Sequence, residues 1–86
     1  MNINQLLEIV KNKLDNNIVC SKIEVEDKTF LHKSHSTHEK NKFHIKLVIF
    51  SKHLRKENKI KSTKKIYKIL EEELKNNIHS IQLLIN

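Results

Sequence analysis

The 86-residue sequence contains no glycine and no proline. Function classes that need the close backbone approach allowed by glycine are therefore excluded, including phosphate-binding loops, dinucleotide-binding fingerprints and the GxxG clamp of RNA-binding domains. Turns must be built from other residues, and asparagine tolerates the left-handed conformation best among those present. We expect Asn16-Asn17 and Asn76-Asn77 to end helices in place of glycine.

Cysteine occurs only once, as Cys20. A single cysteine permits no intrachain disulfide and no all-cysteine zinc or iron–sulfur site, which fits a reducing, cytoplasmic setting. We interpret Cys20 as a small, buried apolar side chain. A metal bound by this chain must use histidines, carboxylates or ligands lent by a partner. No apolar run reaches the length of a membrane span, so we expect no membrane partner.

Positive charge is concentrated in the middle of the chain. The net charge is +7, and residues 28–68 carry 13 Lys or Arg against two acidic residues. Such a segment favours contact with an acidic partner, an anionic tripeptide or nucleic acid, and compositional drift is the alternative interpretation. If DNA is the ligand, we expect Lys59, Lys61, Lys64 and Lys65 to bind it.

Hydrophobic periodicity predicts helices and strands that together form one domain over residues 1–86. In chain order, the expected elements are a helix over residues 3–15 with Asn2 as N-cap, strands over 22–26 and 43–50, a short helical turn from Ser51 through Lys56, a longer helix over 60–74 and a strand over 78–85. Tyr67 and the three phenylalanines lie at core periodicity, so we do not interpret them as a base-stacking platform.

This order, α-β-β-(short α)-α-β, predicts an α+β fold with helices packed on one face of a three-stranded mixed sheet. The last strand follows a helix, so one pairing can be a parallel crossover. The strand over 43–50 is apolar on both faces near its end, which favours a central position covered on both sides.

Histidines are the main candidates for chemistry. His32, His35 and His38 lie close together in the long polar connection between the first two strands, and His79 begins the last strand. Histidine is the commonest metal ligand, and long ordered connections are usually functional. The alternatives are a solvated polar loop for the first three and a histidine bonded to the backbone for His79.

Other chemistry finds less support in the sequence. Zinc binding by His32, His35 and His38 is a further interpretation, but no fourth protein ligand is evident and a structural site needs four. No nucleophile with a base and an orienting group can be identified, so we predict that the protein is not an enzyme. We interpret His44 and His53 as surface residues.

Five short motifs occur in an order and at a spacing that one known family shares. They are Ile23-Glu24-Val25-Glu26-Asp27, His32-Lys33-Ser34-His35, Phe43 to Ser51, Ile66-Tyr67 with Leu70, Glu72, Glu73 and Leu74, and Ile78-His79-Ser80-Ile81. Together they resemble the BolA family over nearly the whole chain. Four features depart from its pattern. Leu54-Arg55-Lys56 lacks the family's glycine, and Ser62-Thr63-Lys64 replaces its basic helix start. Asn41-Lys42-Phe43 lacks the family's histidine before the second strand, and the connection that contains His38 is shorter than in members with a similar histidine motif.

The resemblance implies a KH-like fold without the GxxG loop and a heterodimer with a monothiol glutaredoxin. In that family the heterodimer shares a [2Fe–2S] cluster and takes part in iron–sulfur maturation or in iron and redox regulation. By position, His79 is the shared histidine ligand, and His32 or His35 is the second. The glutaredoxin and glutathione supply two thiolates, so the isolated chain is expected to be a monomer without a cofactor. DNA binding as a transcriptional regulator is the alternative function that the resemblance implies.

Overall fold

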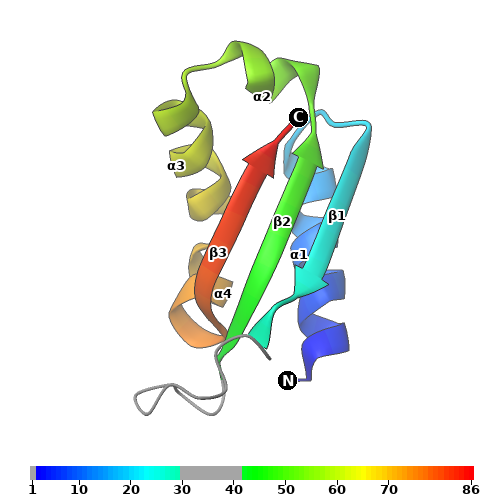
Figure 1. Cartoon of the computed structure of the whole chain (residues 1–86), viewed down its shortest axis with the longest axis vertical. Coiled ribbons are helices and arrows are strands. Elements are labelled where there is room, and N and C mark those ends of the chain that lie inside the picture. The colour runs from blue at the N-terminus through cyan, green and yellow to red at the C-terminus, as the bar shows by residue number, and fades with distance from the viewer. Residues whose placement is uncertain (1, 30–41) are drawn as a thin grey trace.

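The computed structural model describes residues 2–29 and 42–86. In chain order its elements are α1 (Ile3–Asn17), β1 (Lys22–Asp27), β2 (Phe43–Phe50), α2 (Lys52–Lys56), α3 (Lys59–Ile69), α4 (Glu71–Asn76) and β3 (Ile78–Ile85). Figure 1 shows one sheet with the helices behind it, which confirms the predicted α+β fold. No helix within these two ranges combines the length and the apolarity that crossing a bilayer requires.

The sheet is mixed, and its topology brings three chain segments to one corner. The strand order is β1-β2-β3, so β2 is central, as the apolar residues on both faces near its end predict. β1 pairs with β2 in antiparallel fashion, whereas β3 is parallel to β2. A parallel pair needs a crossover connection, and α2, α3 and α4 supply it. The end of β1 and the starts of β2 and β3 therefore lie at the same end of the sheet.

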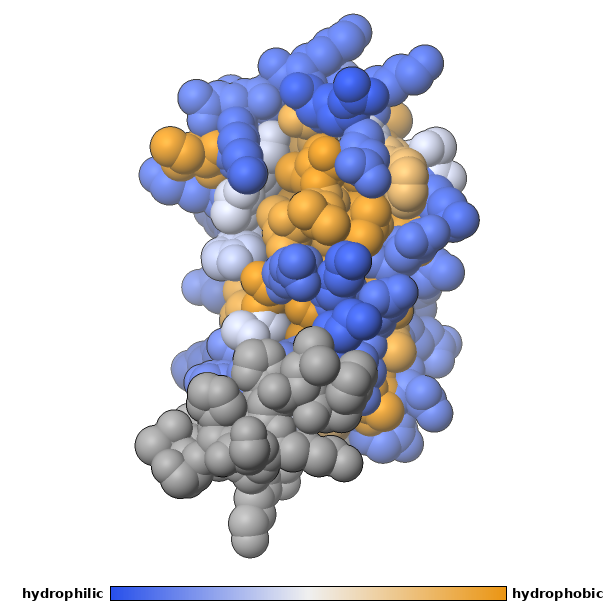
Figure 2. Space-filling model, viewed as in Figure 1, coloured by the Kyte–Doolittle hydropathy of each residue, from blue (hydrophilic) through white to orange (hydrophobic). Residues whose placement is uncertain are grey.

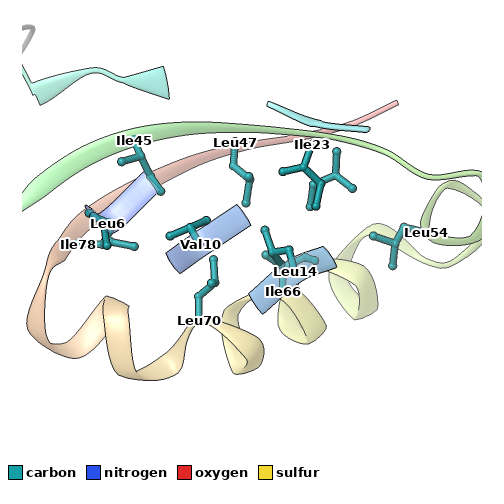
Figure 3. Packing of buried hydrophobic residues seen from close by; sticks show 11 residues of the cluster. Leu6, Val10, Leu14, Ile23, Ile45, Leu47, Leu54, Ile66, Leu70 and Ile78 are labelled. Carbon is teal, nitrogen blue, oxygen red and sulfur yellow. The ribbon is translucent and has the colours of Figure 1, made fainter. Parts of the chain in front are cut away.

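One hydrophobic core fills the space between the sheet and the helices (Figure 3). Ile45, Leu47 and Ile49 point into it from alternate positions of β2. The helical part of the core consists chiefly of Leu6, Val10, Leu14, Leu54, Ile66 and Leu70. These are the two periodicities visible in the sequence, and each fully buried side chain of this kind stabilises the fold by about 1.5–3 kcal/mol.

The opposite face of the sheet is open. In the described part of the chain no helix packs on it, so the expectation that β2 is covered on both sides is wrong. Val48 and Phe50 are half-buried there, and Leu84, which pairs with Val48, is 42% exposed. Figure 2 shows this face, with an apolar area over the upper part of the sheet and a polar band below it. The apolar end of β2 thus reflects a partly exposed surface.

Caps and turns form without any left-handed residue. Asn2 caps α1 as predicted, since its side chain accepts the Gln5 amide at 2.8 Å while its own amide donates to the Gln5 side chain at 3.0 Å. No residue in the two described ranges has a positive φ angle, so the expected left-handed asparagines are absent. Instead Ile18 ends α1 by becoming extended, with φ −134° and ψ 153°. A chain without glycine avoids the left-handed region here rather than tolerating it.

The helix predicted over 60–74 is divided at Leu70, which separates α3 from α4. Leu70 has φ −97° and ψ 17°, and its amide still donates to the Ile66 carbonyl. Both side chains are fully buried, so the local change in direction keeps the chain against the core. Tyr67, which lies at core periodicity in the sequence, is 39% exposed, and Ile60 near the start of α3 is 67% exposed.

Candidate metal-ligand site

His79 lies at an irregularity in the parallel pairing of β2 and β3. Phe43 pairs with Ile78, but the next residue of β2, His44, pairs with Ser80. His79 is therefore an extra residue of β3, in a bulge of the kind that disrupts the ladder locally and turns a side chain away from regular alternation. Its side chain is exposed, so a partner or ligand can reach it.

A second histidine, His44, lies directly against His79. Its Nε2 is 3.3 Å from Nδ1 of His79, and the rings meet edge to face, with centroids 4.8 Å apart and an interplanar angle of 87°. Nδ1 of His44 lies 2.6 Å from the Ser80 hydroxyl oxygen. His44 is only 7% exposed, so its interpretation as a surface residue is wrong. The side chains of His79 and Ser80 on β3 cover the His44 side chain on β2.

Both ends of the connection between β1 and β2 are tied to this corner. The Lys28 amide donates to the His44 carbonyl at 2.7 Å, and the His44 amide donates to the Thr29 hydroxyl at 3.2 Å. At the other end, the Phe43 amide donates to the Asn77 carbonyl at 2.9 Å, just before β3 begins. The connecting segment is therefore joined to the fold beside the histidine pair.

The three histidines of that segment, His32, His35 and His38, lie outside the described residues. Their distances to His79 and the zinc interpretation therefore stay untested. Within residues 2–29 and 42–86, no group of three or more His, Cys, Asp or Glu side chains could hold a metal ion. The exposed imidazole of His79 can supply one ligand position, so a metal bound there would need further ligands from outside these two ranges.

Cys20 lies at the opposite end of the sheet. It precedes β1, whose start pairs with Phe50, six residues beyond His44 along β2, a span of about 20 Å. The half-buried side chain packs against the core. Burial, with a smaller contribution from Asp15, raises the pKa of its thiol and so disfavours the thiolate that binds metals. Cys20 is therefore no candidate ligand for a site at the histidine pair.

The four lysines predicted as a DNA-binding surface, Lys59, Lys61, Lys64 and Lys65, are all exposed on α3. Figure 1 places α3 beside the later part of β3, away from the histidine pair at its start. Lys65 donates to the Glu57 carboxylate at 2.8 Å, and this hydrogen bond lowers the pKa of that carboxyl. The basic surface and the histidine pair are thus two separate features of the fold.

Solved structures with the same fold are found by comparison. The chain matches the BolA domain of SufE1 from Arabidopsis thaliana with a TM-score of 0.82 and 24% identity, covering 99% of this chain and 94% of that one. BolA1 from Arabidopsis thaliana matches with a TM-score of 0.76 and 22% identity, over 93% of this chain and 88% of that one. BolA1 from Mus musculus matches with a TM-score of 0.73 and 14% identity, over 92% of this chain and 62% of that one.

The structural matches, all below 25% identity, establish the fold alone. Comparison with curated protein sequences gives no match. The family model described as BolA-like protein matches residues 14–86, which include both members of the histidine pair. Because that model spans most of the chain, this protein belongs to the BolA-like family.

Proposed function

We propose that this chain acts as a single BolA-like domain without enzymatic activity, and that it joins a monothiol glutaredoxin to hold a shared [2Fe–2S] cluster. His79 supplies one ligand, and His32 or His35 supplies the second. The exposure of the His79 ring at the bulge carries the proposal, because a ligand to a cluster shared between two proteins must lie at the surface. Membership of the BolA-like family supports the choice of partner.

The donor chemistry supports a site shared between proteins. Replacing two thiolates by two imidazoles on one iron is established iron–sulfur chemistry, and it raises the reduction potential. The only cysteine of this chain is half-buried about 20 Å along the sheet. Both thiolates therefore come from the glutaredoxin and its bound glutathione, and the chain alone, a cytoplasmic monomer in this proposal, carries no cluster.

Chain length supports either candidate for the second ligand. Thr29 is held beside His44 by a hydrogen bond, and His32 follows three residues later, a length that spans up to about 10 Å. His35 lies three residues further along. His38 is less favoured, because it falls where the sequence departs from the family pattern.

Mixing the purified chain with a monothiol glutaredoxin, iron, sulfide and glutathione is expected to give a coloured 1:1 heterodimer. The measurements are visible absorption, circular dichroism and native mass spectrometry. A sample with glutaredoxin alone is the control, because a partner's thiolates can hold iron and sulfide without help. A mixture whose spectrum equals that of the control, with no heterodimer mass, contradicts the proposed function.

DNA binding by α3 is the second candidate function, and the exposure of all four lysines favours it. Each phosphate contact lowers the slope of log K against log salt by about 0.9, so four contacts predict a slope of about −3.6 on a short DNA duplex. Replacing Lys59, Lys61 and Lys64 by alanine is expected to reduce that slope by about 2.7. A flat salt dependence in fluorescence anisotropy removes this function.

A further inference from the structure

His44 is not among the residues that the sequence predicts as metal ligands, yet its ring lies directly against that of His79. We propose that His44 is a positioning residue, which engages Nδ1 of His79 and so makes Nε2 the nitrogen that coordinates iron. This inference rests on the proposed function and assigns a role within the same site. It concerns a hydrogen-bonded chain of three side chains, His79, His44 and Ser80.

His44 is anchored well enough to orient another ring. Its carbonyl accepts from the Lys28 amide at 2.7 Å, and its amide donates to the Thr29 hydroxyl at 3.2 Å. On the other side, its Nδ1 lies 2.6 Å from the Ser80 hydroxyl oxygen. With only 7% of the residue exposed, the imidazole has little room to rotate. A ring fixed in this way can hold a more exposed neighbour in one orientation.

Counting protons along the chain gives the role of each atom. A neutral imidazole has one nitrogen that donates and one that accepts, and a metal-binding nitrogen must offer its lone pair. If Nε2 of His79 coordinates, its proton is on Nδ1 and donates to Nε2 of His44, 3.3 Å away. His44 then carries its proton on Nδ1 and donates to the Ser80 hydroxyl.

The reverse direction blocks coordination. If the Ser80 hydroxyl donates to His44, then Nε2 of His44 donates to Nδ1 of His79, and the remaining His79 proton occupies Nε2. Ser80 can serve in either direction because a hydroxyl both donates and accepts. Metal binding at Nε2 therefore requires the direction in which His79 donates to His44.

An acceptor behind a metal-binding histidine fixes the tautomer and the ring orientation, and it makes the coordinating nitrogen more basic. Partners of this kind typically change metal affinity by about 10–100-fold when they are removed. His44 is placed to be that partner, with the bulge at His79 bringing the two rings into contact.

The first test uses the isolated chain and needs no cluster. Long-range ¹H–¹⁵N spectra of labelled protein at about pH 8, where imidazole is mostly neutral, report which nitrogen of each histidine carries the proton. We expect His79 to be held as the Nδ1–H tautomer in the wild type and in the control His53→Ala. In His44→Ala, the two tautomers of His79 are expected to mix. An Nε2–H tautomer in the wild type, or the same His79 spectrum in His44→Ala, overturns the inference.

Two further variants keep the test decisive if His44→Ala does not fold. Ser80→Ala leaves both rings in place and removes only the group that receives the His44 proton, so the Nδ1–H fraction of His79 is expected to fall. His44→Gln offers an amide oxygen to Nδ1 of His79 and is expected to restore that tautomer in part. An unchanged His79 tautomer in Ser80→Ala contradicts the proton chain.

The second test uses the reconstituted glutaredoxin complex. His44→Ala is expected to weaken cluster retention about 10–100-fold and to alter the circular dichroism, with His44→Gln intermediate. Retention equal to that of the wild type and of His53→Ala overturns the positioning role. If the wild type forms no cluster at all, the proposed function fails, whereas the tautomer spectra still decide what His44 does to His79.

Discussion

Replacing His79 by alanine is expected to abolish the visible spectrum of the glutaredoxin complex. In the proposed complex the cluster loses an imidazole ligand, and no group of donor side chains in the described ranges could replace it. Since loss of an orienting partner alone costs about 10–100-fold in metal affinity, loss of the ligand itself is expected to cost about 100-fold or more. Visible absorption and circular dichroism of the reconstituted mixture measure the effect.

The isolated His79→Ala variant is expected to stay folded, because exposed substitutions usually change stability by about 0.5 kcal/mol or less. His53→Ala is the matched control, since His53 is also an exposed histidine, on α2, as the sequence predicts. Single replacements of His32 and His35 then identify the second ligand. A His79→Ala complex that keeps the wild-type spectrum would falsify the ligand assignment.

The fold was largely predictable because local signals and the overall arrangement agree. Alternation at period two predicted the core residues of β2, and the four-residue spacing of Leu6, Val10 and Leu14 predicted the buried face of α1. Asn2 and Ser51 carry side chains suited to capping a helix, and each accepts a hydrogen bond from a backbone amide in the first turn. Motif order then pointed to the BolA-like family.

The arrangement around His79 was less predictable, because it depends on a bulge that no residue in the sequence indicates. His44 occupies a position of β2 that alternation assigns to the open face, where a polar side chain is normally solvated. Only the insertion of His79 into β3 brings the Ser80 hydroxyl and the second ring to it. The division of the predicted helix at Leu70 was equally unpredictable, because neither glycine nor proline occurs there.

The three consecutive glutamates of α4 show a further limit of prediction, because the sequence does not indicate which of them is buried. Glu72 is exposed, with a side chain 77% accessible, and it lies 3.7 Å from Lys13. The Glu73 side chain is only 7% exposed, and its Oε2 accepts from Lys13 Nζ at 2.7 Å. Its other oxygen, Oε1, is buried without a hydrogen-bond partner in the described part of the chain. Glu73 therefore depends on Lys13, a residue on α1.

Replacing Lys13 by methionine is expected to reduce the free energy of unfolding by about 2 kcal/mol. The substitution leaves a buried carboxylate unpaired, which costs about 3–5 kcal/mol for a fully buried pair, and the partial exposure of Lys13 lowers that cost. Urea denaturation followed by circular dichroism measures the change. Glu72→Gln is the control, because its exposed contact with Lys13 contributes about 0–1 kcal/mol.

The double variant Lys13→Met with Glu73→Leu tests whether the loss of stability in Lys13→Met comes from the unpaired carboxylate of Glu73. Apolar replacements of both partners are often neutral or stabilising, so the double variant is expected to be more stable than Lys13→Met alone.

Hydrogen bonding to Glu73 raises the pKa of Lys13 above its usual value of 10.5. The stabilisation by the Lys13–Glu73 pair is therefore fully present below pH 10.5 and is lost as the pH rises through the higher pKa of Lys13 in the folded state. This loss is expected in the wild type and not in Lys13→Met. Equal stability of Lys13→Met and the wild type at neutral pH contradicts the dependence of Glu73 on Lys13.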